Sequence, residues 1–362
     1  MGNVLSSDPN KEKEEERQRL EQEQEYRKLQ ELEEDQLKKE SKAREEEIQA
    51  LKEQLQKKAD GEEKRRKYLE LLEEPWRKIS PEWDDPWKRE FKDELLFKIN
   101  EIEPVGEIKY FNILLLGQAA SGKSSFSNTC STALLDENRL ITTNQVYQGA
   151  SKSVSTSVDT IPMRTKDGKV LPLRLFDCRG LNIVNGVPTE DIRLIIQGHV
   201  KSGYTINPVA PITEDDPRYR KYPEKKDRMH CIVYVANASN PSEQLTDEET
   251  ERQIRHVRET IALQHLPQLV LFTNIDKVRI SNTNKVRDIF RSQGVRDACT
   301  KAAEYMQLPP MNVLPMSNYH VENLPNLEKD ILALFYLLTM MQRARDYIKR
   351  ITQDDVPDDF YD

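Results

Sequence analysis

The sequence predicts an α/β fold, with a doubly wound, mainly parallel sheet that follows a long charged helix. Between residues 109 and 351, short apolar runs alternate with helical stretches. This alternation is typical of parallel strands covered by helices on both faces. A glycine-rich loop at 117–122 separates one such strand from a helix, as in folds that bind phosphate groups. Residues 10–72 are instead almost entirely Glu, Lys, Gln, Arg and Leu, which are strong helix formers.

Composition limits the class of protein before any motif is considered. The chain has 362 residues, enough for one large domain and additional material. Its net charge of −8 argues against a general nucleic-acid binder, so we expect no nucleic-acid partner. The four cysteines lack the spacing of metal ligands and are expected to be free thiols. No secretory signal and no apolar run of about 18 residues is present, which predicts a cytoplasmic protein.

The first segment, residues 1–9, begins Met-Gly-Asn-Val-Leu-Ser and fits the N-myristoylation pattern, with Gly2 as the acylated residue. A single acyl chain holds a protein only weakly on a membrane, and a second signal is usually required. The basic residues that follow are interleaved with glutamates, so they supply no strong second signal. Acylation of Gly2 would therefore give reversible peripheral contact with a membrane.

Residues 10–72 predict one long helix, because opposite charges recur three or four positions apart and proline is absent. Its apolar residues are sparse, and only Ile48, Leu51 and Leu55 keep a 3-4 spacing. Two alternatives stay open: the helix self-associates weakly as a coiled coil, or it stands alone through its charge pairs. Either way we expect a role in spacing or self-association.

Pro75 is expected to stop this helix, and we place the domain boundary near Leu72. Three tryptophans follow within a dozen residues and should pack on the globular domain: Trp76, Trp83 and Trp87. An amphipathic helix over 91–102 then leads into a domain that covers 73–353. The acidic tail, 354–362, is expected to be loose.

The remaining elements follow from periodicity. Strands are predicted over 109–116, 153–163, 170–176, 229–235 and 269–272. The second and third are joined by a hairpin turn at Lys166-Asp167-Gly168-Lys169. Helices are predicted to begin at 123 and to cover 247–263, 285–307 and 327–351.

The loop between the first strand and its helix reads G-x-x-x-x-G-K-S, the phosphate-binding pattern of P-loop proteins. Its glycines allow the backbone N–H groups to turn toward phosphate oxygens, and the helix adds its positive N-terminal end. Lys123 is expected at the β- and γ-phosphates and Ser124 on Mg²⁺. The expected nucleotide contacts are Gly117, Gln118, Ala119, Ala120, Ser121, Gly122, Lys123, Ser124 and Ser125.

A second element, Asp177-Cys178-Arg179-Gly180, ends a predicted strand some 50 residues later and matches D-x-x-G. In this pattern the Asp holds the metal through water and the Gly N–H meets the γ-phosphate. We therefore predict Asp177 as a water-mediated Mg²⁺ ligand and Gly180 as a nucleotide contact.

The base is expected at Thr273-Asn274-Ile275-Asp276, which stands where GTPases usually carry N-K-x-D. Asp276 retains the carboxylate that accepts from guanine N–H groups, which favours guanine over adenine. Thr273 and Asn274 replace the usual Asn and Lys. Ser317-Asn318 follows an apolar stretch and is predicted to complete the base site.

The hydroxyl that closes over the γ-phosphate cannot be chosen from the sequence, because six residues compete: Thr142, Thr143, Ser151, Ser153, Ser155 and Thr156. Leu181 stands where small GTPases place the Gln that orients the attacking water. No catalytic residue is therefore assigned, although Arg179 is a candidate in cis. We predict weak intrinsic GTP hydrolysis.

With these motifs assembled, the chain resembles the interferon-induced protein 44 and 44-like family. The shared sequence motifs include Pro75-Trp76-Arg77, the segments 115–126, 226–231 and 272–276, and Ser317-Asn318-Tyr319. The resemblance covers roughly residues 74–351 and implies a cytoplasmic GTPase-like domain that is induced by interferon and acts in antiviral or immune response. The Met-Gly start and charged helix depart from the family and look closer, in arrangement only, to lipid-anchored immunity-related GTPases.

The leading hypothesis is thus a GTP-binding switch protein that uses GTP or GDP with Mg²⁺. The rival is a scaffold or interaction protein that has kept the fold with a vestigial nucleotide site, and the altered Thr273-Asn274 pair favours it. An ATPase is a third reading, which tighter binding of ATP than of GTP would support.

Overall fold

The computed structural model describes residues 9–80, 82–141, 157–178, 180–181, 186–238, 248–262, 265–278, 285–320 and 322–353. The chain divides into two compact units, Met1–Lys67 and Tyr68–Asp362. No helix among the described residues is long and apolar enough to cross a membrane.

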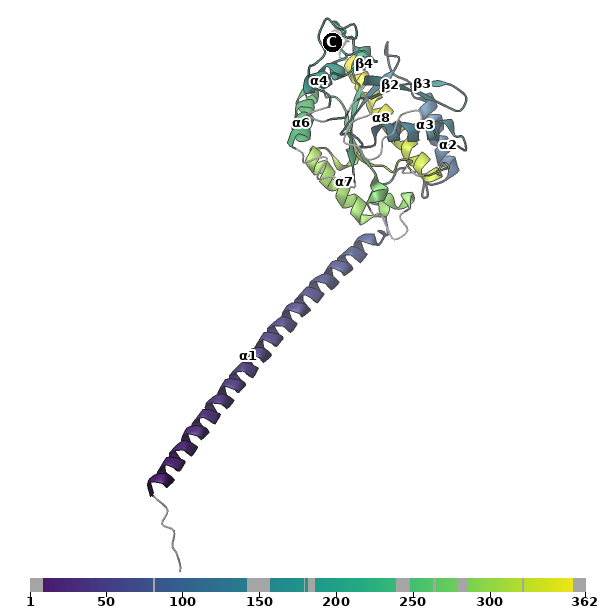
Figure 1. Ribbon diagram of the computed structural model, residues 1–362. Coiled ribbons are helices and arrows are strands. Elements are labelled where there is room, and N and C mark those ends of the chain that lie inside the picture. Colours follow the sequence, from purple (N-terminus) through teal and green to yellow (C-terminus); the bar gives the residue numbers. More distant parts are fainter. Residues whose placement is uncertain are drawn as a thin grey trace, which may run out of the picture. The chain divides into compact units, whose positions relative to one another are not determined.

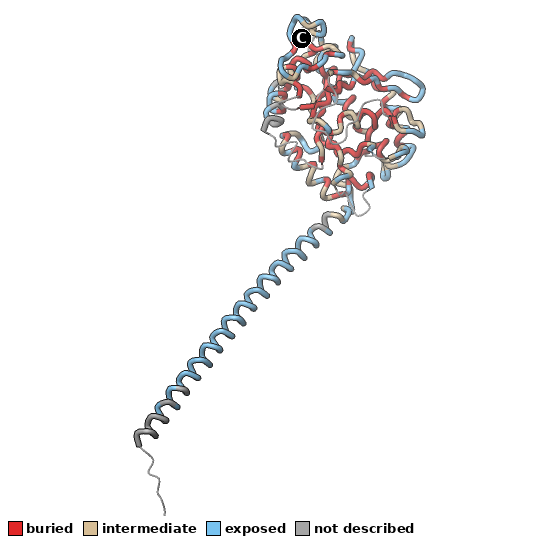
Figure 2. The backbone as a smooth tube through the Cα atoms, in the orientation of Figure 1, coloured by how far each residue is buried: buried red, intermediate tan, exposed pale blue. Residues whose placement is uncertain are grey.

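Helix α1 (Pro9–Leu69) confirms the long charged helix. Its described side chains before Leu69 are exposed along its whole length (Figure 2). Ion pairs four residues apart support it, among them Arg17–Glu21 at 3.3 Å and Arg27–Glu23 at 3.1 Å. The helix ends at Leu69 rather than at Pro75, because Leu71 leaves the helical conformation to form a β-bridge with Ser292.

Within the described residues of the second unit, seven strands form one sheet (Figure 1). They are β1 (Phe111–Leu116), β2 (Ser157–Arg164), β3 (Val170–Asp177), β4 (Tyr204–Thr205), β5 (Cys231–Asn237), β6 (Gln268–Thr273) and β7 (Val313–Pro315). Their order is β4-β2-β3-β1-β5-β6-β7. Strand β2 is antiparallel to both β3 and β4, and the other pairs are parallel. The sheet is therefore mixed but mostly parallel.

Helices lie on both sides of this sheet (Figure 1). Packed together on one side are α2 (Arg89–Glu101), α3 (Lys123–Leu135) and α8 (Leu327–Gln353). The other side carries α4 (Thr189–Gln197), α6 (Glu248–Ala262) and α7 (Gln293–Met306). Every residue of β1 is buried, which explains why its sequence is a continuous apolar run.

The three tryptophans pack against the core of the second unit, as predicted. The Trp76 indole N–H donates to the Ile289 carbonyl at 3.1 Å, and its ring centroid lies 5.6 Å from that of Phe290. The Trp83 indole N–H donates to Glu94 at 2.8 Å. The indole N–H groups of Trp76 and Trp83 are thus satisfied while the rings of these residues cover apolar surface.

One predicted helix, 285–307, is wrong at its first turns. Residues Val286–Arg291 form a 3₁₀-helix, and α7 begins only at Gln293. Ser292 separates the two because its extended backbone forms the bridge to Leu71 and its hydroxyl accepts the Val295 N–H as an N-cap. Helix α4 and the short strands β4 and β7 were not predicted.

Candidate nucleotide-binding site

The predicted phosphate-binding loop, 117–122, lies at the carboxyl end of β1, between β1 and α3. Strand β1 pairs with β3 on one side and with β5 on the other. The chain therefore changes direction across the sheet at β1. Open α/β sheets bind ligands at such a switch point, beyond the carboxyl ends of the strands.

The backbone at Gly117 leaves no room for a side chain. A Cβ built there would lie 2.1 Å from the Val235 carbonyl oxygen. At the other end of the loop, Gly122 has φ of +99° and precedes the first turn of α3. The two glycines therefore permit a tight curl that other residues would not.

Lys123 is buried at the start of α3, with 7% of its surface exposed. Its ammonium donates to the carbonyl oxygens of Gly117, at 2.9 Å, and of Gln118, at 2.8 Å. Burial lowers the pKa of Lys123, and the charge of Asp177 opposes that shift. The lysine thus lies against the loop from which it is expected to reach phosphate.

The two predicted metal ligands are in direct contact. The Ser124 hydroxyl donates to Asp177 Oδ2 at 2.6 Å. The other carboxylate oxygen, Oδ1, is buried and has no hydrogen-bond partner among the described residues. Burial raises the pKa of Asp177, whereas Lys123 and the Ser124 hydrogen bond oppose the shift. A hydroxyl beside a carboxylate oxygen that lacks a partner fits a hard cation such as Mg²⁺.

The D-x-x-G segment crosses directly over the loop. A Cβ at Gly180 would lie 2.5 Å from the Ala119 amide nitrogen. The Leu181 N–H donates to the Gly117 carbonyl at 3.0 Å, and Leu181 forms a parallel bridge with Gln118. Arg179, the candidate arginine in cis, lies outside the described residues.

Thr273 has a role that the sequence did not suggest. It is buried, and its hydroxyl lies 2.5 Å from the Ser121 carbonyl and 3.2 Å from the Ala236 carbonyl. Because a hydroxyl donates only one hydrogen, the shorter contact to the loop takes precedence. Thr273 therefore ties the end of β6 to the phosphate-binding loop. Asn274 follows with φ of +55°, a conformation that Asn tolerates well.

The two predicted base-site segments meet. The Ser317 hydroxyl donates to Asp276 Oδ1 at 3.1 Å, and the Ile275 N–H donates to the Met316 carbonyl at 3.2 Å. Asn318 reaches back toward α3, with its amide nitrogen 3.4 Å from the Gly122 carbonyl. The Asp276 carboxylate, which is expected to recognise guanine, is thus held beside Ser317, at the same ends of the strands as the phosphate-binding loop.

Other predicted residues line the loop without forming a cluster of their own. Ala119 and Ala120 form its outer turn, where Ala120 has φ of +58°, and Ser125 lies in the first turn of α3. The Ser121 hydroxyl is buried and has no partner among the described residues. The six hydroxyl residues that compete for the γ-phosphate lie outside the described residues, as does Gly2.

A polar network that sequence reasoning missed supports the 317–319 segment. Lys329 Nζ donates to the Asn318 carbonyl at 2.9 Å. The Tyr319 hydroxyl donates to Asp330 at 2.7 Å, and Lys92 donates to that same carboxylate at 2.7 Å. These residues lie on α2, α8 and the loop before α8, and no local pattern connects them. Their contacts depend on the tertiary fold.

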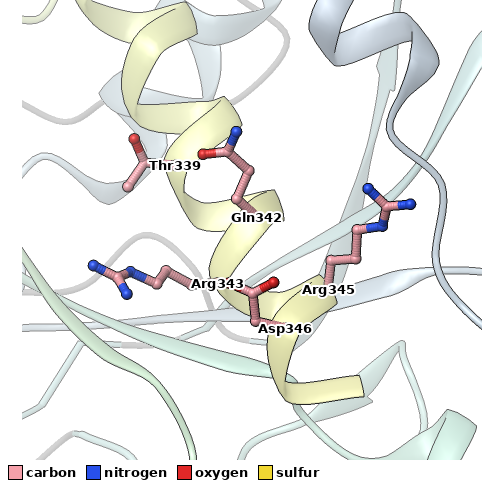
Figure 3. A pocket seen from close by; sticks show the side chains of 5 residues that line it. All are labelled: Thr339, Gln342, Arg343, Arg345 and Asp346. Carbon is pink, nitrogen blue, oxygen red and sulfur yellow. The ribbon is translucent and has the colours of Figure 1, made fainter. Parts of the chain in front are cut away.

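A hollow of about 400 Å³ on α8 lies elsewhere (Figure 3). The side chains described around it all come from this helix: Thr339, Gln342, Arg343, Arg345 and Asp346. Arg343 and Asp346 also line a neighbouring hollow with Gln268 and Asn312, at the amino ends of β6 and β7. The nucleotide motifs lie at the opposite, carboxyl ends of the strands. This hollow is therefore separate from the predicted site.

Comparison with known proteins identifies relatives, although no family model matches. The chain is 27% identical over 258 residues to interferon-induced protein 44 of Mus musculus and 28% identical over 264 residues to that of Homo sapiens. It is 26% identical over 265 residues to the human 44-like protein. These matches cover 70–72% of this chain but only 58–60% of the relatives, so the chain spans about three fifths of their length.

A more distant similarity, 26% over 149 residues, links the chain to cell division control protein 11 of Saccharomyces cerevisiae. It covers 40% of this chain and 33% of that protein.

The resemblance to the interferon-induced protein 44 and 44-like proteins is confirmed by the matches to those proteins, which cover most of the chain.

Proposed function

We propose that this chain, a relative of the interferon-induced protein 44 and 44-like proteins, is a GTP-binding switch protein of interferon-induced antiviral and immune response. Its second unit would be a doubly wound domain of the P-loop GTPase type, acting in the cytoplasm. The names of the relatives support the biological setting. The geometry of the phosphate-binding loop supports the molecular activity.

The contact between Ser124 and Asp177 carries the proposal. Two motifs 53 residues apart place a hydroxyl and a carboxylate 2.6 Å from each other, beside the buried Lys123. With Mg²⁺ bound, Ser124 would be a direct ligand, Asp177 would hold the metal's water, and the metal would offset phosphate charge. The loop N–H groups and the start of α3 would orient the phosphates.

Guanine preference is assigned to Asp276. The carboxylate accepts from Ser317 through one oxygen, which fixes its orientation at the edge of the site. A carboxylate there would accept from the two N–H groups that guanine presents and adenine lacks, whereas an amide would mismatch them.

Equilibrium binding of fluorescent GTP, GDP and ATP with Mg²⁺ tests this assignment. We expect Asp276→Asn to weaken GTP binding by about 30-fold or more, as the loss of hydrogen bonds to a charged group predicts, and to leave ATP unchanged. Asp346→Asn, on the exposed face of α8 at the other edge of the sheet, is the matched control and should bind GTP like the wild type. Tighter ATP than GTP binding that ignores Asp276→Asn would instead identify an ATPase.

Hydrolysis is proposed to be weak. Leu181 stands where a water-orienting Gln is expected, is 2% exposed, and bonds through its backbone to Gly117. Its apolar side chain cannot orient water. Single-turnover hydrolysis by dilute protein should therefore proceed at the rate of an unactivated GTPase, on the order of 10⁻⁴ s⁻¹. A rate of 1 s⁻¹ or more would contradict the proposal.

A scaffold protein with a vestigial nucleotide site is the second candidate. Hydrogen bonds within the protein favour it: Thr273 donates to the Ser121 carbonyl, and Lys123 donates to two carbonyls of the phosphate-binding loop. The loop is thereby held by the protein itself. Absence of saturable GTP binding in the wild type, with the fold intact, would select the scaffold over the switch.

We also propose reversible membrane contact through a myristoyl group on Gly2, on the strength of the M-G-x-x-x-S start. Mass spectrometry of the N-terminus after expression in eukaryotic cells tests this. A retained Met1 would exclude it, because the acyl chain is attached to the exposed Gly2 amine.

A further inference from the structure

We propose that α1 pairs with α1 of a second copy of this chain, in antiparallel orientation, with the pair centred at Glu40 and Ser41. The proposal concerns the first unit and does not depend on nucleotide binding. It chooses between the two roles left open for this helix and fixes the direction and register of the pairing.

An apolar stripe runs along α1. Because α1 is one uninterrupted helix, successive residues advance by about 100°. Six large apolar residues then fall within an arc of about 100°, although they are irregular in heptad spacing. They are Tyr26, Leu29, Leu37, Ile48, Leu51 and Leu55, and each is 55–64% exposed. Exposed large apolar residues gathered on one face indicate a surface for a partner.

Charged residues on the same stripe decide the orientation. Glu33, Glu40, Arg44 and Glu47 lie within this arc, between Leu29 and Ile48. A parallel, in-register pair would set each of them against its own copy, and facing like charges destabilise an interface. A parallel pair is therefore disfavoured despite the apolar match.

In an antiparallel pair whose facing residue numbers add to 81, none of these residues directly faces its own copy. Tyr26 then faces Leu55, and Arg44 lays its aliphatic stem across Leu37. Further out on the same face, Arg19 meets Glu62 with opposite charge. Glu33 faces Ile48 and Glu40 faces Ser41, so no charged residue of the stripe faces its own copy.

The overall charge of the helix supports the same orientation. In this register residues 12–40 face residues 41–69. Residues 12–40 contain seven basic and twelve acidic side chains, for a net charge of −5. Residues 41–69 contain nine basic and seven acidic side chains, for a net charge of +2. An antiparallel pair places each acidic half along the basic half of the other copy. This complementarity is the reason to choose a second copy as the partner.

Disulfide trapping in the full-length chain tests the register. One chain carries Tyr26→Cys and a second, differently tagged chain carries Leu55→Cys. The two chains are mixed and oxidised without nucleotide. We expect the mixed disulfide to dominate, because these positions face each other only in the antiparallel pair. The native cysteines, at 130, 178, 231 and 299, are buried and should contribute little. Gln24→Cys mixed with Lys57→Cys is the matched control: it keeps the sum of 81 but lies on the opposite face, and should not cross-link.

A charge exchange gives an independent readout by sedimentation equilibrium. Arg19→Glu should weaken self-association about tenfold, since the twofold pair contains this contact twice, and adding Glu62→Arg should restore it. Both sites are exposed on the helix surface, so the fold should be unaffected. A Tyr26→Cys chain that cross-links mainly to itself, or a wild type that stays monomeric at 100 µM or more, would overturn the proposal. Neither result would bear on GTP binding.

Discussion

His230 shows how one buried residue can fix a connection between strands. It is fully buried, and its Nδ1 accepts the Asn112 N–H at 3.0 Å. Its Nε2 lies 3.1 Å from the Lys225 carbonyl, which can only accept, so Nε2 carries the proton. The Asn112 side-chain amide in turn donates to the carbonyls of Lys226 and Arg228, both at 2.9 Å. The segment before β5 is thereby held against β1.

This arrangement predicts a pH-dependent stability. Burial lowers the pKa of His230 to about 4, below the value of 6.5 expected in the unfolded chain. Because the folded pKa is the lower one, the stabilisation is complete above pH 6.5 and is lost as the pH falls from 6.5 toward 4. We expect the free energy of unfolding to fall by about 2 kcal/mol between pH 7 and pH 5 from this group.

Urea unfolding at pH 7 and pH 5 measures the effect, with His230→Gln as the comparison. The variant retains a side chain that can donate and accept but cannot gain a proton in this range. Its loss between the two pH values should be smaller than that of the wild type by about 2 kcal/mol. Equal losses in the two proteins would show that His230 does not titrate as proposed.

At the scale of elements, the sequence predicts what local pattern determines. Strands β1, β5 and β6 are continuous apolar runs because helices cover both faces. Strands β4 and β7 are only two and three residues long, so they have no periodicity to detect. Helix α4 covers nine residues, about two and a half turns, which is shorter than the stretch of about 11–18 residues over which a helical period is sought.

The same limit applies to the candidate site. Motif spacing predicted the loop, Asp177 and Asp276 as parts of the site. It could not show that Thr273 bonds to Ser121, because that contact joins segments 152 residues apart and depends on how β6 lies against the loop. Lys123 was expected to face phosphate, and only the structure shows its bonds to the loop carbonyls.

Helix α2 is attached to the core through a buried ion cluster, and this predicts a large effect of one substitution. Lys92 is 2% exposed and donates to Asp136 at 2.6 Å, after α3, and to Asp330 at 2.7 Å, in α8. Lys92→Met would leave the buried carboxylate of Asp330 without its cation, whereas Asp136 would keep Arg89, which donates to it at 2.8 Å. We expect the free energy of unfolding to fall by about 3–5 kcal/mol, as for other broken buried ion pairs.

Urea unfolding of Lys92→Met and Lys88→Met tests this. Lys88 pairs with Asp85 at 3.9 Å and its side chain is 56% exposed, so its substitution should change stability by less than about 0.5 kcal/mol. Comparable losses for the two variants would mean that the cluster contributes no more than a surface pair. Asp330 also accepts from Tyr319, which directly follows Ser317 and Asn318 of the predicted base site. Lys92→Met should therefore also weaken GTP binding.

At the scale of the whole molecule, the stability of each of the two units should depend on a different variable. Helix α1 is charged and exposed, and the proposed partner for its apolar stripe is a second copy. Its stability should then depend on protein concentration. The second unit encloses a buried sheet and the candidate nucleotide site, so its stability should depend on ligand instead.

Two spectroscopic probes separate these transitions. The three tryptophans all belong to the second unit, so their fluorescence reports that unit alone, whereas circular dichroism at 222 nm reports both. On heating, we expect an early dichroism phase that shifts upward with protein concentration and is absent from fluorescence. The fluorescence midpoint should rise with GTP and Mg²⁺, by about 2.7 kcal/mol of stabilisation at 100 times the dissociation constant, and ATP at the same concentration should raise it less. A single transition shared by both probes, and unmoved by concentration or GTP, would contradict the independence of the units and the proposed site together.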